Sequence, residues 1–222
     1  MKTEKVRESS RGKLIVFEGL DGSGKSSQLN NLNERLSALK IPNVLTREPS
    51  DKNIIGLMAR GAVNGTFDIE KESLALLFAA DRYEHVTKEI VPALEKGITV
   101  LCDRYYFSNF AYQSVTTSLE RIIQHNEKVM EILKPDVTIF LDTDAQECVR
   151  RINQDRYERV EMFEDLDNLK LVRNNFLKAF ETLKESENII VIETNGLTES
   201  RVAEEIWIRL MPIFYDEKGS KR

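Results

Sequence analysis

The residues best suited to chemistry form a glycine-rich run near the start of the chain, Gly19-Leu-Asp-Gly-Ser-Gly-Lys-Ser26. The run fits the pattern G-x-x-x-x-G-K-[ST], in which curled backbone N–H groups and the start of the next helix bind phosphate. Lys25 can reach the β- and γ-phosphates of a nucleoside triphosphate, and the Ser26 hydroxyl can coordinate Mg²⁺. The pattern therefore predicts a triphosphate site made by Gly19, Leu20, Asp21, Gly22, Ser23, Gly24, Lys25, Ser26 and Ser27.

Two arginine-containing runs, 46–49 (TREP) and 103–105 (DRY), each follow a short apolar run. One such arginine is more often part of a surface ion pair. Two of them near a triphosphate site suit a nucleoside monophosphate, which needs fixed, bidentate cations. Water as the phosphate acceptor would instead make the chain an NTPase or a switch protein, although the N-K-x-D run of a guanine-nucleotide switch is not visible in the sequence.

Five short apolar runs alternate with helical patterns along the chain. We expect strands at 13–17, 43–46, 98–102, 137–141 and 189–192. Helices are expected at 26–40, 52–62, 68–96, 119–133, 144–154, 166–184 and 198–211, with Pro92 kinking or dividing the third. This order predicts an α/β protein of the P-loop NTPase fold, with a five-stranded parallel sheet and helices on both faces. Ligands of such sheets bind at the carboxyl ends of the strands, and the glycine-rich run and both arginine-containing runs fall at those ends.

Length and composition favour one compact domain. The 222 residues are 41% hydrophobic and 31% charged, and we assign 13–212 to a single domain between a disordered segment 1–12 and a polar tail 213–222. The net charge of −5 disfavours nonspecific nucleic-acid binding, which needs an excess of Lys and Arg. Cys102 and Cys148 lie in apolar contexts and are expected to be buried and reduced.

No apolar run approaches the ~20 residues of a membrane span, and the first residues contain no apolar secretion segment. We therefore expect a cytoplasmic protein that does not bind membranes.

Four segments together resemble the thymidylate kinase family, in the order of its motifs. They are residues 17–28 (FEGLDGSGKSSQ), 46–49 (TREP), 77–82 (LFAADR) and 103–113 (DRYYFSNFAYQ). The likeness covers roughly residues 13–210. It implies a homodimeric enzyme that transfers the γ-phosphoryl group of ATP to dTMP, with Mg²⁺, for dTTP synthesis.

The resemblance also implies how the base would be held. Phe78 would stack on thymine, since nucleobases bind well to aromatic faces. Arg82 would hydrogen-bond the carbonyl edge of the base. Asn109, with Gln113 as a possible second group, would satisfy its N3 side.

The remaining implied roles concern the sugar, the phosphate and the metal. Tyr112 would crowd the 2′ position and favour deoxyribose, with Ser108 in the same set. Asp21 would contact the 3′-hydroxyl or the metal shell. Arg47 and Arg104 would bind the dTMP phosphate. Asp103 would lie near Mg²⁺, with Asp142 as the weaker alternative for that role.

Phosphoryl transfer also calls for an arginine at the transferred group. One subgroup of the family carries it in the phosphate loop, at the position of Gly22 here, so we expect it from a short lid at about 153–165. Arg156 and Arg159 are the candidates, and 158–161 (ERVE) resembles the D-R-I-E lid motif of bacterial-type enzymes. The segment before that motif is shorter than usual, so the choice between the two arginines stays open, as does a solvated helix face with no catalytic role.

Two rival functions remain at this point. Another nucleoside monophosphate or deoxynucleoside kinase would share the loop but not the base pocket. A hydrolytic or noncatalytic P-loop module would turn ATP over, or bind it, without any nucleotide acceptor.

Overall fold

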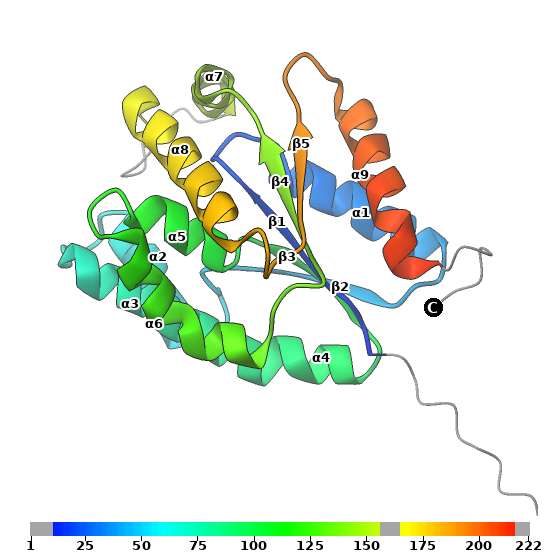
Figure 1. The fold of residues 1–222 in the computed structure, drawn as a ribbon, viewed down its shortest axis with the longest axis horizontal. Coiled ribbons are helices and arrows are strands. Elements are labelled where there is room, and N and C mark those ends of the chain that lie inside the picture. The colour runs from blue at the N-terminus through cyan, green and yellow to red at the C-terminus, as the bar shows by residue number, and fades with distance from the viewer. Residues whose placement is uncertain (1–10, 156–164, 216–222) are drawn as a thin grey trace, which may run out of the picture.

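The computed structural model describes residues 11–155 and 165–215 (Figure 1). Five parallel strands form one sheet in the order β2-β3-β1-β4-β5. The strands are β1 (Leu14–Gly19), β2 (Asn43–Arg47), β3 (Thr99–Asp103), β4 (Val137–Asp142) and β5 (Ile189–Glu193). The predicted α/β fold with a five-stranded parallel sheet is confirmed.

Helices cover both faces of the sheet because successive strand residues point to opposite sides. Ile15 and Phe17 of β1 pack toward α1 (Lys25–Ala38) and α9 (Glu199–Phe214), whereas Leu14 and Val16 pack in the second core. That second core includes α4 (Val91–Glu95), α5 (Tyr106–Gln113), α6 (Leu119–Ile132) and α8 (Leu166–Leu183). Figure 1 shows α1 and α9 on one side of the sheet and α5 and α8 on the other. Two apolar layers therefore fix the sheet and the loops at its ends.

The carboxyl ends of the strands are aligned by the register of the sheet. Arg47 pairs with Asp103, and Asp103 pairs with Phe17 of β1. On the other side, Leu141 pairs with Gly19. The strands run one or two residues further than predicted, so Arg47 and Asp103 are the last residues of their strands. Their side chains are consequently placed by sheet hydrogen bonding as well as by loops.

Two helical regions differ from the prediction. The segment 106–113 forms α5, which the sequence did not indicate because all eight of its residues are buried and no polar face marks its period. The predicted helix 68–96 is divided into α3 (Lys71–His85), a π-helical stretch η1 (Val86–Ile90) and α4. Pro92 lies in the first turn of α4, where its missing N–H is tolerated. The predicted helix is therefore interrupted by the π-helical stretch just before Pro92, and not at the proline itself.

The packed part of the described chain begins earlier and ends later than the predicted domain, 13–212. Gly12 is buried and its N–H donates to Leu94 O at 2.9 Å, so residues 11 and 12 belong to the fold rather than to a disordered segment. At the other end α9 continues past Pro212 to Phe214, whose ring stacks on Trp207 at 6.3 Å between centroids. The polar tail therefore begins after the helix, later than residue 213.

The remaining helices are α2 (Ile54–Val63), which packs on α3, and α7 (Ala145–Asp155), which packs on α8. Cys102 and Cys148 are free and buried, as predicted. Among the helices of residues 11–155 and 165–215, none is long and apolar enough to cross a bilayer. The predicted lid at about 153–165 lies mostly outside the described residues.

Candidate active site

Two cavities meet at the carboxyl ends of the strands. The first, here called the loop cavity, has a volume of about 580 Å³ and runs along the glycine-rich loop toward α7 and α9. The second, the aromatic cavity, has a volume of about 360 Å³ and opens between β2, α2, α3 and α5. The two share four lining residues, which define the junction: Asp21, Ser26, Asp103 and Arg104.

The glycine-rich loop adopts a conformation that needs glycine. Gly24 caps α1 with φ of 93°, and Gly22 has φ of 78°. A Cβ atom at Gly22 would lie 2.6 Å from the carbonyl oxygen of Cys148, because α7 packs directly on the loop. Residue 22 therefore has no room for a side chain in this conformation of the loop.

Lys25 lies over the loop. Its Nζ donates to the carbonyl oxygens of Gly19 (3.1 Å) and Leu20 (2.8 Å). Burial lowers the pKa of Lys25, and the charge of Arg104 lowers it further. Of the nine predicted triphosphate-binding residues, 21–27 line the loop cavity. Gly19 and Leu20 do not; they hold Lys25 through their carbonyls, and the Leu20 side chain packs in the core.

Arg104 places a guanidinium at the junction. Its backbone has φ of 70°, a left-handed conformation that is uncommon outside glycine and frequent at functional sites. Its side chain donates to Asp21 Oδ1 at 2.6 Å, to Ser108 Oγ at 2.8 Å and to the Tyr112 hydroxyl at 3.2 Å. The Tyr112 hydroxyl in turn donates to Asp21 Oδ2 at 2.8 Å. These bonds aim the cation at the space between the cavities.

Asp21 is ionised in this arrangement. Burial alone would raise the pKa of its carboxyl group, but the charges of Arg104 and Lys25 and the Tyr112 hydrogen bond lower it well below its usual range. The junction therefore combines the guanidinium of Arg104 with the carboxylates of Asp21 and Asp103, and Lys25 lines the loop cavity beside it.

A residue that the sequence did not single out, Glu18, supports this turn from within the sheet. It is fully buried, and its carboxylate accepts the N–H of Tyr105 (2.8 Å), the N–H of Ser108 (3.0 Å) and the hydroxyl of Ser108 (2.5 Å). Burial raises its pKa to about 7, against the opposing effects of Ser108 and Arg104. The sequence feature that could have identified Glu18 is that it is the one charged residue in the otherwise apolar strand β1.

The aromatic cavity collects all nine predicted acceptor residues. Phe78 on α3 is half-buried in its wall, and Arg47 lies at its mouth, paired with Asp51 at 2.9 Å. The cavity is lined by Asp21, Arg47, Phe78, Arg82, Arg104, Ser108, Asn109, Tyr112 and Gln113. It also includes Arg60, the one charged residue of helix α2, which was not among the predicted residues.

Arg82, which is predicted to hydrogen-bond the base, is largely engaged by neighbouring residues. It is 2% exposed, and Nε donates to Glu48 Oε2 at 2.6 Å. Nη1 donates to Asn109 Oδ1 (3.2 Å) and Asn126 Oδ1 (2.5 Å), and Nη2 donates to Tyr105 O (3.2 Å). Four of its five N–H groups are thus used by residues of the described fold, which leaves one for a ligand.

Glu48 and His85 anchor this guanidinium. Glu48 Oε1 lies 3.2 Å from His85 Nδ1, and His85 Nε2 lies 2.7 Å from Thr46 Oγ1. Burial would lower the pKa of His85, but the hydrogen bond and charge of Glu48 raise it. The sequence indicated no role for Glu48, the third residue of the TREP run, because its partners Arg82 and His85 lie 34 and 37 residues away along the chain.

Asp103 and Ser26 fit a divalent cation. Asp103 Oδ2 lies 3.4 Å from Ser26 Oγ, and Asp103 Oδ1 is buried with no hydrogen-bond partner within the described chain. Carboxylate and hydroxyl oxygens are the ligands that Mg²⁺ prefers. Asp142, the alternative, is instead bound by both donors of Arg173, at 2.6 and 2.8 Å.

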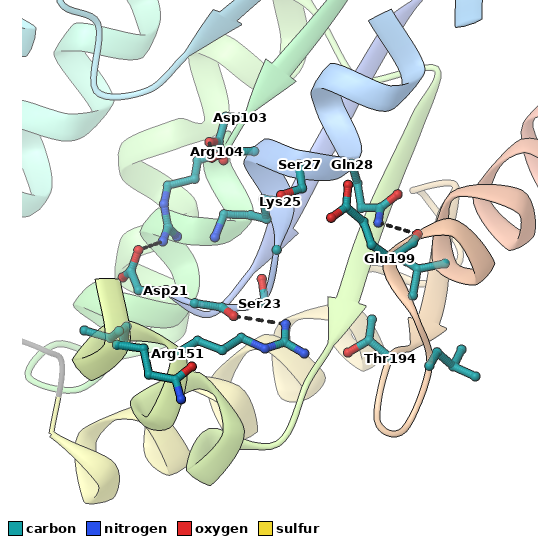
Figure 2. A pocket seen from close by; sticks show the side chains of 17 residues that line it. Asp21, Ser23, Lys25, Ser27, Gln28, Asp103, Arg104, Arg151, Thr194 and Glu199 are labelled. Atoms are coloured by element: carbon teal, nitrogen blue, oxygen red, sulfur yellow. Dashed lines mark hydrogen bonds and ion pairs between the residues drawn. The ribbon is translucent and has the colours of Figure 1, made fainter. Parts of the chain in front are cut away.

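A further cation reaches the loop from α7. Arg151 Nη1 donates to Gly22 O at 3.3 Å, and its Nε donates to Glu147 Oε1 at 2.8 Å. Figure 2 shows Arg151 approaching the loop from the side opposite Lys25 and Arg104. Arg151 was not among the predicted residues, and the predicted lid arginines, Arg156 and Arg159, lie outside the described residues.

Comparison with known proteins places these features in a family context. A family model described as "Thymidylate kinase" matches residues 17–206. The chain is 36% identical over 190 residues to the thymidylate kinase of Ligilactobacillus salivarius, covering 83% of this chain and 91% of that protein. It is 41% identical over 180 residues to a probable thymidylate kinase of Pyrococcus abyssi, covering 79% and 86%.

A solved structure agrees with these matches. The thymidylate kinase of Candida albicans superposes with a TM-score of 0.75 at 26% identity, covering 91% of this chain and 92% of that one. The similar sequences include archaeal as well as bacterial proteins, so the bacterial-type lid suggested by residues 158–161 is not supported.

Proposed function

The chain belongs to the thymidylate kinase family, which phosphorylates dTMP to dTDP with ATP, and we propose that this reaction takes place where its two cavities meet. The loop cavity would hold ATP and the aromatic cavity would hold dTMP. The observation that carries this assignment is the junction: Arg104 lines both cavities, and Lys25 lines the loop cavity close enough to Asp21 to affect its pKa.

Phosphoryl transfer depends on positioning and charge neutralisation more than on covalent chemistry. An oxygen of the dTMP phosphate would attack the γ-phosphorus of ATP in line, without a strong general base, because a phosphate monoester is largely ionised at neutral pH. Lys25 would exchange the carbonyls of Gly19 and Leu20 for phosphate oxygens. Arg104, with Arg47, would bind the dTMP phosphate, and Asp21 would contact the 3′-hydroxyl or the metal shell.

The base would occupy the wall of the aromatic cavity. Phe78 would stack on thymine, and the remaining Nη2 hydrogen of Arg82 would reach a carbonyl of the base. Gln113 is the better placed amide for the N3 side, because its Oε1 accepts only from Asn109 and keeps a lone pair for the N3–H group, whereas Asn109 Oδ1 already accepts from Arg82 and Asn126. Tyr112 and Ser108 would lie along the sugar, where Tyr112 would favour deoxyribose.

Ser26 and Asp103 would hold Mg²⁺. When bound, the ion would neutralise charge on the transferred phosphates. The proposal is supported by the buried, unpartnered Oδ1 of Asp103 and by the engagement of Asp142 with Arg173.

Positive charge at the γ-phosphate would come from the α7 side of the loop cavity. Arg156 and Arg159 remain the proposed lid arginines. Arg151 already lies against the loop and would supply charge there.

We also propose that the enzyme is a homodimer, as in the family. Exposed apolar side chains on two helices that pack together, α2 and α3, support a dimer. Ile54 and Leu57 of α2 and Leu76 of α3 are 70%, 48% and 48% exposed. Apolar side chains gathered in this way are typical of an interface.

A coupled ADP-release assay across monophosphates tests the function. We expect turnover that requires dTMP, with lower kcat/KM for dUMP, and very little for UMP or thymidine. Preference for UMP or thymidine would indicate one of the other kinases. ADP release without any acceptor would indicate a hydrolytic P-loop module and would contradict the proposal.

A further inference from the structure

We propose that Asn126, which lines neither of the two cavities, is a positioning residue that fixes the direction of the hydrogen-bond donors presented to the acceptor base. This inference rests on the proposed base pocket, and it adds a residue from α6 that would set base selectivity without touching the substrate.

Asn126 is a buried amide on an apolar helix face. It is 0% exposed and lies between Ile122 and Val129, which are also buried, on the side of α6 that packs against α3 and α5. A buried primary amide needs hydrogen-bond partners. In this position it can reach Arg82 on α3 and Asn109 on α5, and it bonds both.

Arg82 determines which atoms of this hydrogen-bond network donate and which accept. A guanidinium can only donate, so the two atoms that face its Nη1 must be acceptors. These are Asn126 Oδ1 at 2.5 Å and Asn109 Oδ1 at 3.2 Å. Asn126 Nδ2 then donates to Asn109 Oδ1 at 2.9 Å and to Ile122 O at 2.8 Å. Only one orientation of the Asn126 amide satisfies all three contacts.

The orientation of the Asn126 amide determines the orientation of the Asn109 and Gln113 amides, which line the aromatic cavity. Asn109 Oδ1 receives two donors, which use both of its lone pairs, and Asn109 Nδ2 donates to Gln113 Oε1 at 3.0 Å. The Gln113 amide is therefore oriented with Nε2 as its donor side, and this atom has no partner among the described residues. Both free donors, Gln113 Nε2 and the last Nη2 hydrogen of Arg82, belong to residues that line the aromatic cavity.

Donors at these positions select a base by its edge. Thymine carries a carbonyl acceptor at C4, where cytosine carries an amino donor. A fixed donor facing an amino group leaves both without an acceptor, which disfavours cytosine. Without Asn126, the Arg82 guanidinium would lose one of its four partners and the Asn109 amide could rotate, so the contrast between the two bases should weaken.

The test is Asn126→Leu in the full chain. Leucine continues the apolar stripe of Ile122 and Val129, so the helix should still pack. We expect the KM for dTMP to rise about tenfold, because a charged hydrogen bond is lost behind the base. The kcat at saturating dTMP and the KM for ATP should change less than about threefold. The ratio of the dCMP inhibition constant to the dTMP KM should fall about tenfold.

Two further variants separate positioning from packing. Val129→Ala removes buried volume from the same helix face and should lower the melting temperature without changing the dCMP to dTMP ratio. Asn126→Asp keeps the acceptor for Arg82 but loses the donor to Asn109, and should lower the ratio as well. If Asn126→Leu does not fold, Asn126→Asp decides the matter by the same ratio.

Wild-type KM and selectivity in the folded Asn126 variants would overturn the inference, as would the same loss of selectivity in Val129→Ala. A wrong assignment of the base pocket would give a different result from a wrong role for Asn126. In that case Arg82→Lys would leave the KM for dTMP unchanged, whatever the Asn126 variants show.

Discussion

Arg104 and Asp21 form a 2.6 Å ion pair at the point where the two cavities meet. The pair joins the end of β3 to the glycine-rich loop, two segments 83 residues apart. It holds the guanidinium toward the junction and keeps Asp21 ionised. The cation is thus oriented by the fold before any phosphate competes for it, which reduces the ordering required on binding.

Replacing Arg104 with lysine tests this arrangement. Lysine keeps the charge but cannot offer parallel N–H groups to a phosphate while it also bonds Asp21. We expect kcat/KM for dTMP to fall about 100-fold, which corresponds to the loss of roughly 3 kcal/mol from charge-assisted hydrogen bonds. The KM for ATP should change little. Steady-state kinetics with each substrate varied in turn would check this, and an unchanged kcat/KM would remove Arg104 from the phosphate site.

Glu18 should make folding stability depend on pH. Its pKa is raised from 4.5 to about 7 by burial, so the folded chain retains a proton that the unfolded chain loses above pH 4.5. The contribution to the free energy of unfolding is fully present below about pH 4.5 and is lost as the pH rises through 7. The expected loss is on the order of 3 kcal/mol, from about 1.4 kcal/mol per pKa unit.

Urea unfolding of wild type and Glu18→Gln from pH 5 to pH 8 would measure this loss. Glutamine does not titrate, so the difference in unfolding free energy between the two proteins should move by that amount in favour of Glu18→Gln as pH rises. Other titrating groups cancel in the difference. A difference that is constant with pH would contradict the raised pKa.

The parts of the site that the sequence predicted are those with local signals. Gly19, Gly24 and Lys25 sit at fixed spacings where a strand leads into a helix, and Arg47 and Arg104 follow apolar runs whose ends must align in a parallel sheet. These features need only neighbouring residues and the topology. These residues therefore lie near one another at the carboxyl ends of the strands, as Figure 2 shows for Lys25, Asp103 and Arg104.

What the sequence missed depends on contacts between distant segments. Glu18 supports a turn 87 residues away, and Asn126 bonds a guanidinium 44 residues away. No spacing rule links such pairs. Helix α5 was missed for a different reason: it is buried on all sides, so the polar and apolar alternation that marks a surface helix is absent from residues 106–113.

Phe78→Ala should weaken dTMP binding without changing ATP binding. Stacking of a base on an aromatic ring is worth about 1–3 kcal/mol, so we expect the KM for dTMP to rise about 5- to 150-fold. Phe67→Ala is the matched control, because Phe67 is an exposed phenylalanine that lines neither cavity. Equal effects of the two substitutions would argue against stacking by Phe78.

Asp103→Asn should raise the Mg²⁺ concentration required for half-maximal activity by at least about tenfold, because an amide is a poorer ligand than a carboxylate for a hard cation. Asp142→Asn should leave that concentration unchanged, since Asp142 is bound by Arg173. Titration of activity with Mg²⁺ at fixed ATP would compare the variants. A stronger effect of Asp142→Asn would reverse the assignment of the two aspartates.

Leu57→Glu should convert a dimer into a monomer. Leu57 lies with Ile54 on the exposed side of α2, and a carboxylate buried in an apolar interface would cost several kcal/mol without a partner. Light scattering after size-exclusion chromatography would report the mass. Ile208→Glu is the control, because Ile208 is 52% exposed on α9, which packs on α1 rather than on α2 or α3. A dimer that survives Leu57→Glu but not Ile208→Glu would move the interface to α9, since only a substitution within the contact can disrupt it by charge.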